Sequence, residues 1–295
     1  MNEIICVVVT YNRKKMLVEN IEALLKQSYK KFDILVVDNA STDGTYEEIL
    51  SFIDKKEVNY VNTERNLGGA GGFSFGVKYA IENNYKYCWV MDDDTIMNYD
   101  ALESLINKVD MLKDKFSFLC SLVKWKDGEI CKMNIPGIDK KWIYTIDPSI
   151  KNLIPIEYGS FVSCFINIKY VKLVGLPIKE FFIYADDYEF TQRLYSKEHG
   201  YLDLDSIAIH KMGKNNPLNF LEENPNRIDR YVYMYRNSMY ISRKKGGINV
   251  VKQFLVCGRD ILKVIFKPNS NKFRKVLIIL KGMVKGLMFN PKIEF

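Results

Sequence analysis

The first hundred residues alternate between two hydrophobic periodicities, and this alternation constrains the fold more than any other feature of the chain. Apolar runs typical of buried strands cover residues 4–10, 32–37, 59–61 and 87–91. Apolar residues at helical spacing lie between these runs, at residues 14–27, 46–53 and 72–83. Strands that alternate with helices predict a parallel sheet with right-handed crossovers. We therefore expect an α/β fold with a mostly parallel central sheet flanked by helices.

Polar residues follow each of these four strands. They are Thr10-Tyr11-Asn12-Arg13, Asp38-Asn39, Arg65-Asn66 and Asp92-Asp93-Asp94. Each group alone has a structural explanation, such as beginning a turn or capping a helix. Because ligands of open parallel sheets bind outside the carboxyl ends of the strands, four such groups at one edge favour a binding site there.

Three adjacent carboxylates at Asp92, Asp93 and Asp94 repel one another unless a cation neutralises them. Mg²⁺ and Mn²⁺ prefer oxygen ligands, so the run predicts a divalent cation that bridges to phosphate oxygens. The competing interpretation is a solvated acidic loop.

Residues 66–73 read NLGGAGGF and lead into the third expected helix. Glycines here allow backbone NH groups to approach an anion at the helix N-terminus, or allow close packing of the helix on the sheet. A dinucleotide fingerprint is disfavoured because no GxGxxG follows the first strand.

Four segments together, VVVTYNR, VVDNASTDGT, ERNLGGAGGF and WVMDDDT, resemble the family 2 glycosyltransferases, which are nucleotide-sugar enzymes with the GT-A fold. The resemblance covers about residues 3–240. Within that family the chain is most similar to the bacterial galactofuranosyltransferases, and relatives that use a dTDP-rhamnose donor share most of the pattern.

The resemblance implies roles for individual residues at the edge of the sheet. Those expected to contact the nucleotide-sugar donor are Thr10, Tyr11, Arg13, Asp38, Arg65, Asn66, Gly69, Asp92 and Asp93. Asp92 and Asp94 are expected to bind the Mn²⁺ or Mg²⁺ ion. His210, after an alternating run at residues 202–209, would complete the metal site; a lone histidine at a strand end is otherwise more often structural.

The second half is expected to supply the acceptor site and a base. Residues 181–190 read FFIYADDYEF, in which Asp186 and Asp187 match the acidic pair that opens a helix in the family. Inverting transfer needs a carboxylate that takes the proton of the acceptor hydroxyl. We predict Asp187 as this base and Asp186 as a residue that orients the acceptor; simple helix capping is the alternative. Arg236 is a candidate contact of the donor diphosphate, with core packing as its alternative.

Charge is strongly segregated along the chain. From Arg236 onward there are 14 lysines and arginines but only two acids, whereas the first 235 residues carry 29 basic and 34 acidic residues. Residues 251–266 and 274–289 are basic and amphipathic, which is typical of helices at an anionic membrane surface. Packing on the catalytic domain, or on a second subunit in a homo-oligomer, is the alternative. Nucleic acid is disfavoured because no binding motif accompanies the charge.

The six cysteines are scattered and form no CxxC, so we expect buried, reduced thiols in a cytoplasmic protein. The N-terminal residues are expected to form a strand and not a signal peptide, and no apolar run is long enough to cross a bilayer. We expect a peripheral protein on the inner face of the cell membrane.

These observations predict a GT-A catalytic domain at residues 1–240, with a nucleotide-sugar half at 1–110 and an acceptor half at 111–240, followed by a basic helical region at 241–295. The function predicted is metal-dependent, inverting transfer of galactofuranose from UDP-galactofuranose to a lipid-linked or cell-surface glycan. A dTDP-rhamnose-dependent rhamnosyltransferase and a non-catalytic nucleotide-sugar or glycan-binding protein are the alternatives.

Overall fold

The first strand, β1 (Ile4–Thr10), is buried along its whole length because helices cover both faces of the sheet to which it belongs. The structure is a computed structural model, and it describes residues 2–295. Every expected strand and helix of the first hundred residues is present, with ends that differ by a few residues.

The elements that begin the chain are α1 (Lys14–Leu25), β2 (Phe32–Asp38), α2 (Thr45–Asp54), β3 (Asn59–Asn62), α3 (Gly68–Glu82), β4 (Tyr87–Asp92), β5 (Thr95–Met97) and α4 (Ala101–Leu112). The middle of the chain forms β6 (Phe118–Trp125), β7 (Gly137–Ile138), α5 (Trp142–Thr145), β8 (Leu153–Tyr158), β9 (Cys164–Asn167), α6 (Ile168–Val174), η1 (Lys179–Phe181), α7 (Asp186–Tyr195) and β10 (Gly200–His210). The last elements are η2 (Ile228–Arg230), α8 (Tyr231–Lys244), α9 (Gly247–Phe266) and α10 (Lys272–Met288).

The strands form one sheet in the order β3-β2-β1-β4-β9-β6-β10-β8-β7, and β5 pairs with β10. The pairs among β1 to β4 are parallel, as expected from the alternating pattern. Beyond β4 the pairing is of both kinds: β6 and β10 are parallel, whereas β9 runs antiparallel to β4 and β6, and β8 and β5 run antiparallel to β10. The sheet is therefore mixed, because the second half of the chain lacks the regular strand–helix alternation that enforces parallel pairing.

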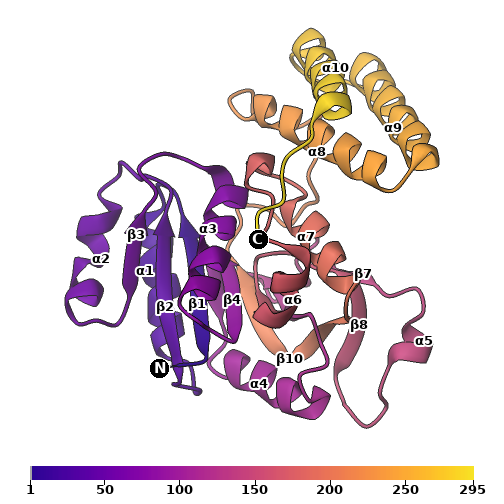
Figure 1. Ribbon diagram of the computed structural model, residues 1–295. Helices are drawn as coiled ribbons and strands as arrows, with labels where there is room; N and C mark the ends of the chain where they lie inside the picture. The colour runs from indigo at the N-terminus through magenta and orange to yellow at the C-terminus, as the bar shows by residue number, and fades with distance from the viewer. Residues whose placement is uncertain (1) are drawn as a thin grey trace.

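Alternate residues of β1 contribute to two different cores. Ile4, Cys6 and Val8 pack with α1, α2 and α4 on one face of the sheet. Ile5 and Val7 pack with α3, α6 and α7 on the other face. The sheet with the helices on its two faces, residues 2–210, thus has three layers and is called the sheet body below (Figure 1).

Helix α3 begins at Gly68, four residues before the expected start at residue 72, so the glycines lie inside the helix. A Cβ atom at Gly72 would lie 2.5 Å from Val9, and one at Gly76 would lie 2.3 Å from Val7. These two glycines therefore allow α3 to pack closely on β1. Gly69 has no such neighbour closer than 4.0 Å and remains open to an approaching ligand.

Helices α8, α9 and α10 pack together beyond one end of the sheet (Figure 1). Their shared core includes Tyr231, Tyr235, Cys257 and Ile279. The residues after α10 return to the sheet body, where Leu176 donates a backbone hydrogen bond to the Glu294 carbonyl at 2.7 Å. The two basic segments are thus packed helices that are tied to the sheet body at both ends.

Two further expectations concern the cysteines and the membrane. All six cysteines are free and buried, as expected. Among residues 2–295, the structure contains no helix with the length and apolar composition needed to cross a bilayer.

Candidate active site

The carboxyl ends of the first four strands meet at one edge of the sheet, as the sequence predicted. Thr10 lies opposite Asp38 in the pairing of β1 with β2, and Asp92 lies opposite Val9 in the pairing of β1 with β4. Asp38 in turn lies opposite Asn62 on β3. The side chains that follow these strands therefore share one region of the surface.

Each carboxylate of the Asp92-Asp93-Asp94 run has a different set of neighbours. Asp93 is buried and accepts hydrogen bonds from the Thr10 hydroxyl at 2.8 Å and from Arg13 at 3.3 Å. Asp94 also pairs with Arg13, and it lies 3.1 Å from Nε2 of His210. No described residue donates a hydrogen bond to the side chain of Asp92.

These environments shift the pKa values of Asp92 and Asp94 in opposite directions. Burial, and then the charge of Asp94, raises the pKa of Asp92 to about 7. Burial alone would raise the pKa of Asp94 as well, but the hydrogen bond from His210 and the charge of Arg13 hold it below its ordinary value. Burial alone would lower the pKa of His210, yet Asp94 raises it to about 10.

Asp92, Asp94 and His210 fit a divalent cation. One ligand atom from each residue lies within 4.8 Å of the others. Two carboxylates and an imidazole suit Mn²⁺, and the side chain of Asp92 accepts no hydrogen bond from the described residues. The structure thus brings together the three residues that were predicted as metal ligands.

Asn134, which sequence reasoning missed, fixes the orientation of His210. Nδ1 of His210 lies 2.9 Å from Oδ1 of Asn134, which can only accept, so Nδ1 carries a proton and Nε2 faces Asp94. Asn134 is itself held by Ser160, to which its amide donates at 3.2 Å. Asn134 lies in a stretch without periodicity, and no motif in the sequence distinguishes it.

Asp38, expected to contact the donor, is buried at the end of β2. Its carboxylate accepts hydrogen bonds from the Ser41 NH at 2.9 Å and from the Tyr60 hydroxyl at 2.8 Å. Asn39, next to it, donates to the Gly68 carbonyl at 3.0 Å and so ties this strand end to the start of α3.

The remaining expected donor contacts are more open. Tyr11, Arg65 and Asn66 are exposed at the same edge of the sheet. Asn66 accepts a hydrogen bond from the Gly68 NH at 2.8 Å, which closes the turn into α3. Their exposure leaves them available to a ligand, and their contact with the nucleotide stays a prediction.

Asp186 and Asp187 open α7, as expected. Both lie in the first turn of α7. The residue before the helix, Ala185, has a left-handed conformation, and no described side chain caps the N-terminus of the helix. Burial, and then the charges of Asp187 and Asp92, raises the pKa of Asp186 well above its ordinary value. The charge of Asp92 thus acts on Asp186, so the two lie close enough for their charges to interact.

Asp187 has the ionisation of a useful base. Burial raises its pKa to about 6, and the backbone NH groups of Tyr188 and Phe161 offset only part of this effect. A carboxylate with this pKa is ionised at neutral pH and is more basic than an exposed aspartate.

The loop before α7, residues 181–185, is called the base loop below. Phe182, Tyr184 and Ala185 have φ of 63°, 71° and 63°, a region that costs non-glycine residues on the order of 1–3 kcal/mol each. Its carbonyl groups accept hydrogen bonds from Arg236 and Asn237 of α8. The guanidinium of Arg236, a predicted contact of the diphosphate, lies between Tyr233 and Phe289 in this structure.

Comparison of sequences with known proteins identifies the family. The family model named Glycosyl transferase family 2 matches residues 5–164. A galactofuranosyltransferase, GlfT1 of Mycolicibacterium smegmatis, is 36% identical over 93 residues, which are 31% of this chain and 30% of the relative. The UDP-Glc:alpha-D-GlcNAc-diphosphoundecaprenol beta-1,3-glucosyltransferase WfgD of Escherichia coli is 31% identical over 110 residues, which are 37% of this chain and 41% of the relative.

Solved structures confirm the fold. The crystal structure of GalNAc-T7 with UDP, GalNAc and Mn²⁺ superposes with a TM-score of 0.60 at 15% identity, covering 85% of this chain and 54% of the other. The mixed sheet with flanking helices is thus a GT-A fold, as predicted. The matches span only about a third of the length of these curated relatives.

We predict that Asn134→Ala weakens Mn²⁺ binding about 10- to 100-fold, because the imidazole of His210 loses the partner that orients it. The free Mn²⁺ concentration, followed by electron paramagnetic resonance in the presence of UDP, measures this effect. Asn152→Ala, which removes a surface hydrogen bond to Asp205, is the control and should bind Mn²⁺ normally. Equal Mn²⁺ affinity in all three proteins would show that His210 does not depend on Asn134.

Proposed function

The chain belongs to glycosyl transferase family 2, and from this membership we propose that it transfers a sugar, with inversion, from a nucleotide-sugar donor to an acceptor hydroxyl. The observation that carries the proposal is the presence of a three-ligand cation site together with an acidic pair at the start of α7, whose buried member, Asp186, has a pKa raised in part by the charge of Asp92. A non-catalytic binding protein would need neither the elevated pKa of Asp187 nor its position at a helix start.

Asp92, Asp94 and His210 would hold the Mn²⁺ or Mg²⁺ ion. The cation, when bound, would stabilise the negative charge that develops on the leaving diphosphate. Arg13 and Thr10 hold Asp93, and Arg13 also holds Asp94, so the carboxylates keep their geometry while the donor binds. The exposed Arg65, Asn66 and Tyr11 and the open Gly69 are the proposed contacts of the donor nucleotide and sugar.

Asp187 takes the proton of the acceptor hydroxyl while the acceptor oxygen forms its bond to the anomeric carbon. The bond from that carbon to the diphosphate oxygen breaks on the opposite face, which inverts the configuration, and the nucleoside diphosphate leaves. Asp186, whose burial favours the protonated form, can donate a hydrogen bond that orients the acceptor.

We propose UDP-galactofuranose as the donor and a lipid-linked or cell-surface glycan as the acceptor. The donor rests on the similarity to a galactofuranosyltransferase, which is 36% identical over 93 residues. The lipid-linked acceptor rests on WfgD, whose name describes a diphosphoundecaprenol substrate.

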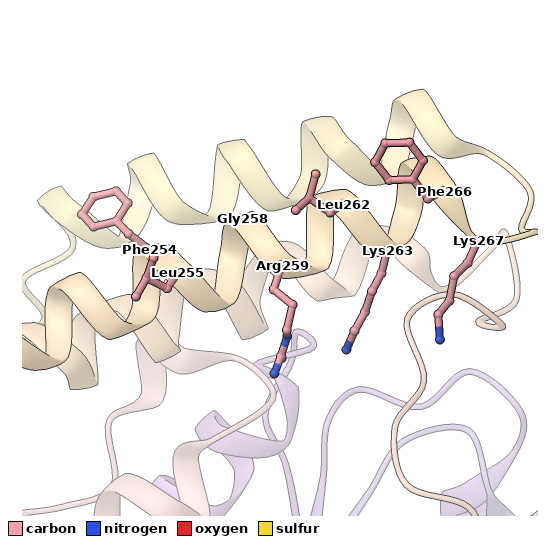
Figure 2. Close-up of a pocket in the computed structure, with 8 residues that line it drawn as sticks. All are labelled: Phe254, Leu255, Gly258, Arg259, Leu262, Lys263, Phe266 and Lys267. Atoms are coloured by element: carbon pink, nitrogen blue, oxygen red, sulfur yellow. The ribbon is translucent and has the colours of Figure 1, made fainter.

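We also propose that α9 and α10 hold the enzyme on the anionic inner face of the cell membrane. Large apolar side chains on α9 remain exposed in the folded protein: Ile248 is 74% exposed, Leu255 68% and Phe266 79%. Figure 2 shows Phe254, Leu262 and Phe266 on one side of α9, while Arg259, Lys263 and Lys267 extend from the other. Apolar side chains beside a row of basic ones suit the boundary between acyl chains and anionic headgroups.

We predict that the purified protein with Mn²⁺ releases UDP from UDP-galactofuranose and consumes no other sugar in a panel of UDP- and dTDP-linked donors. Release of the nucleoside diphosphate, resolved by chromatography, measures turnover. Asp94→Asn, which removes a cation ligand, is the inactive control. Turnover of dTDP-rhamnose alone would assign the enzyme to the rhamnosyltransferases, and binding of UDP-sugars without any turnover would favour a binding protein.

We predict that Asp187→Asn lowers kcat on the order of 1,000-fold while the affinity for UDP is unchanged, because the amide cannot accept the proton. Initial rates and UDP titration measure the two effects. Asp100→Asn, an exposed aspartate before α4, is the control.

The pH profile of the unaltered enzyme checks the same assignment. A base must be ionised, so kcat/KM is expected to fall about tenfold per pH unit below about pH 6 and to level off above it. The charge of Asp187 in turn contributes to the raised pKa values of Asp186 on the same helix and of Cys164 on β9. Full activity of Asp187→Asn would place the base elsewhere.

For the membrane, we predict that replacing Leu255, Leu262 and Phe266 together by serine lowers binding to phosphatidylglycerol vesicles more than about tenfold. Each of these side chains should contribute about 1.5–3 kcal/mol to membrane binding when it moves from water into the acyl region. All three are exposed in the folded protein, so their replacement should leave folding unaffected. Cosedimentation with vesicles and thermal unfolding are the measurements.

The control for this experiment is the double variant Ile143→Ser with Tyr144→Ser, which removes exposed apolar side chains from α5 instead. This variant should bind vesicles like the unaltered protein. Unchanged vesicle binding of the α9 variant would contradict the membrane role and favour packing against another protein surface.

A further inference from the structure

Asn237 on α8 is fully buried, and its amide is used entirely to hold the base loop. Nδ2 donates to the carbonyl groups of Phe181 at 3.1 Å, Ile183 at 3.1 Å and Tyr184 at 2.8 Å. Oδ1 accepts a hydrogen bond from Nε of Arg236 at 2.9 Å, which fixes the orientation of the amide. An asparagine placed only for packing would not need a set of three carbonyl partners from one short segment.

The base loop needs such an external partner because its own backbone makes few hydrogen bonds. Phe182 forms a tight turn in which the Ile183 NH donates to the Phe181 carbonyl at 2.7 Å. The left-handed conformations of Tyr184 and Ala185 then turn the chain into α7. The carbonyl groups of Ile183 and Tyr184 would lose the donor that they have in the described structure if Asn237 were absent, whereas the Phe181 carbonyl would keep Ile183 and Arg236.

The loop is also fixed on both of its sides. On the α8 side, Arg236 donates to the Glu180 carbonyl at 2.6 Å, and the ring of Phe182 stacks on Tyr233 with centroids 4.9 Å apart. On the α3 side, the Ala70 NH donates to the Phe182 carbonyl at 3.2 Å. A Cβ at Gly68 would lie 2.1 Å from that carbonyl oxygen, so only glycine allows α3 and the loop to approach this closely.

We propose that Asn237 is a positioning residue for the base: with its amide oriented by Arg236, it holds residues 181–185 so that Asp187 faces the acceptor hydroxyl. This inference rests on the proposed transfer reaction. It gives Arg236 a role in positioning, through the base loop, in place of a direct contact with the donor diphosphate.

The experiment compares Asn237→Ala with Ser238→Ala, a neighbour on α8 whose side chain makes no hydrogen bond in the described structure. For Asn237→Ala, kcat is expected to fall about 100-fold with little change in donor KM, because a displaced base costs rate and not binding. Hydrogen–deuterium exchange should rise in the peptide covering residues 178–190 and stay unchanged in the peptides of β1 and β4. Ser238→Ala should match the unaltered protein in both measurements.

The pH dependence of kcat/KM supplies a measurement that would not change in Asn237→Ala if Asn237 had a purely structural role. A released loop admits water around Asp187, which brings its pKa down toward the ordinary value for aspartate. The acid limb of kcat/KM in Asn237→Ala should therefore move to lower pH by about one unit.

The results that overturn the proposal are distinct from those that overturn the reaction. If Asn237→Ala folds and keeps the kcat of the unaltered protein, Asn237 does not position the base. If the unaltered protein turns over no donor, the transfer reaction is wrong. Hydrogen–deuterium exchange then tests by itself whether Asn237 holds the base loop: unchanged exchange at residues 178–190 in Asn237→Ala overturns this.

Arg236→Met is the second variant, used if Asn237→Ala fails to fold. Methionine keeps the apolar stem between Tyr233 and Phe289 but removes the donors to Asn237 and Glu180. A lower kcat at unchanged donor KM supports the proposal. A raised donor KM at unchanged kcat would overturn it and assign Arg236 to the diphosphate.

Discussion

Mutual repulsion among Asp92, Asp93 and Asp94 is the constraint on which the site depends. The chain relieves it by giving each carboxylate a different partner: Thr10 and Arg13 hold Asp93, while Arg13 and His210 hold Asp94. These partners come from the end of β1, from Arg13 just after it and from β10, and β1 and β10 are not neighbours in the sheet. The short strand β5 follows the acidic run directly and brings it to β10, because Thr95 pairs with His210. Asp92 receives no such hydrogen bond from the described residues, and a bound cation would supply the missing partner.

The glycines at the start of α3 connect this acidic site to the base. Gly72 and Gly76 let the helix lie against β1, which places Gly68 beside the carbonyl of Phe182. The donor side and the base loop are therefore in direct contact through backbone atoms, with little space for either to move alone. Both interpretations of the glycines hold in different places: close packing explains Gly72 and Gly76, and ligand access remains for Gly69.

The parts of the site that could be predicted are those encoded by local periodicity. Buried runs separated by helices are sufficient to place Thr10, Asp38 and Asp92 at one edge, because parallel strands must end together. His210 required the family resemblance, since its position depends on the antiparallel pairing of β10 with β5, which no periodicity indicates. Asn134 and Asn237 act through hydrogen bonds between distant segments, and an asparagine looks the same in sequence whether its partners are backbone carbonyls or water. The start of α3 was placed too late because glycine disfavours helices in isolation, whereas here packing on β1 outweighs that preference.

The segregation of charge has a structural counterpart in the helical unit formed by α8, α9 and α10. Basic residues occur on all three helices, whereas the attachment of the unit to the sheet body lies on α8 and in the residues after α10. Phe181 and Tyr240 share one small core, and Lys179 pairs with Glu294. Removing α9 and α10 would therefore expose the core that they share with α8 and would disturb the base loop, so loss of activity on truncation cannot distinguish a membrane anchor from a packing element. The exposed side chains of α9 can be changed without touching Asn237, which makes the two roles of this unit, membrane contact and support of the base, separable in experiment.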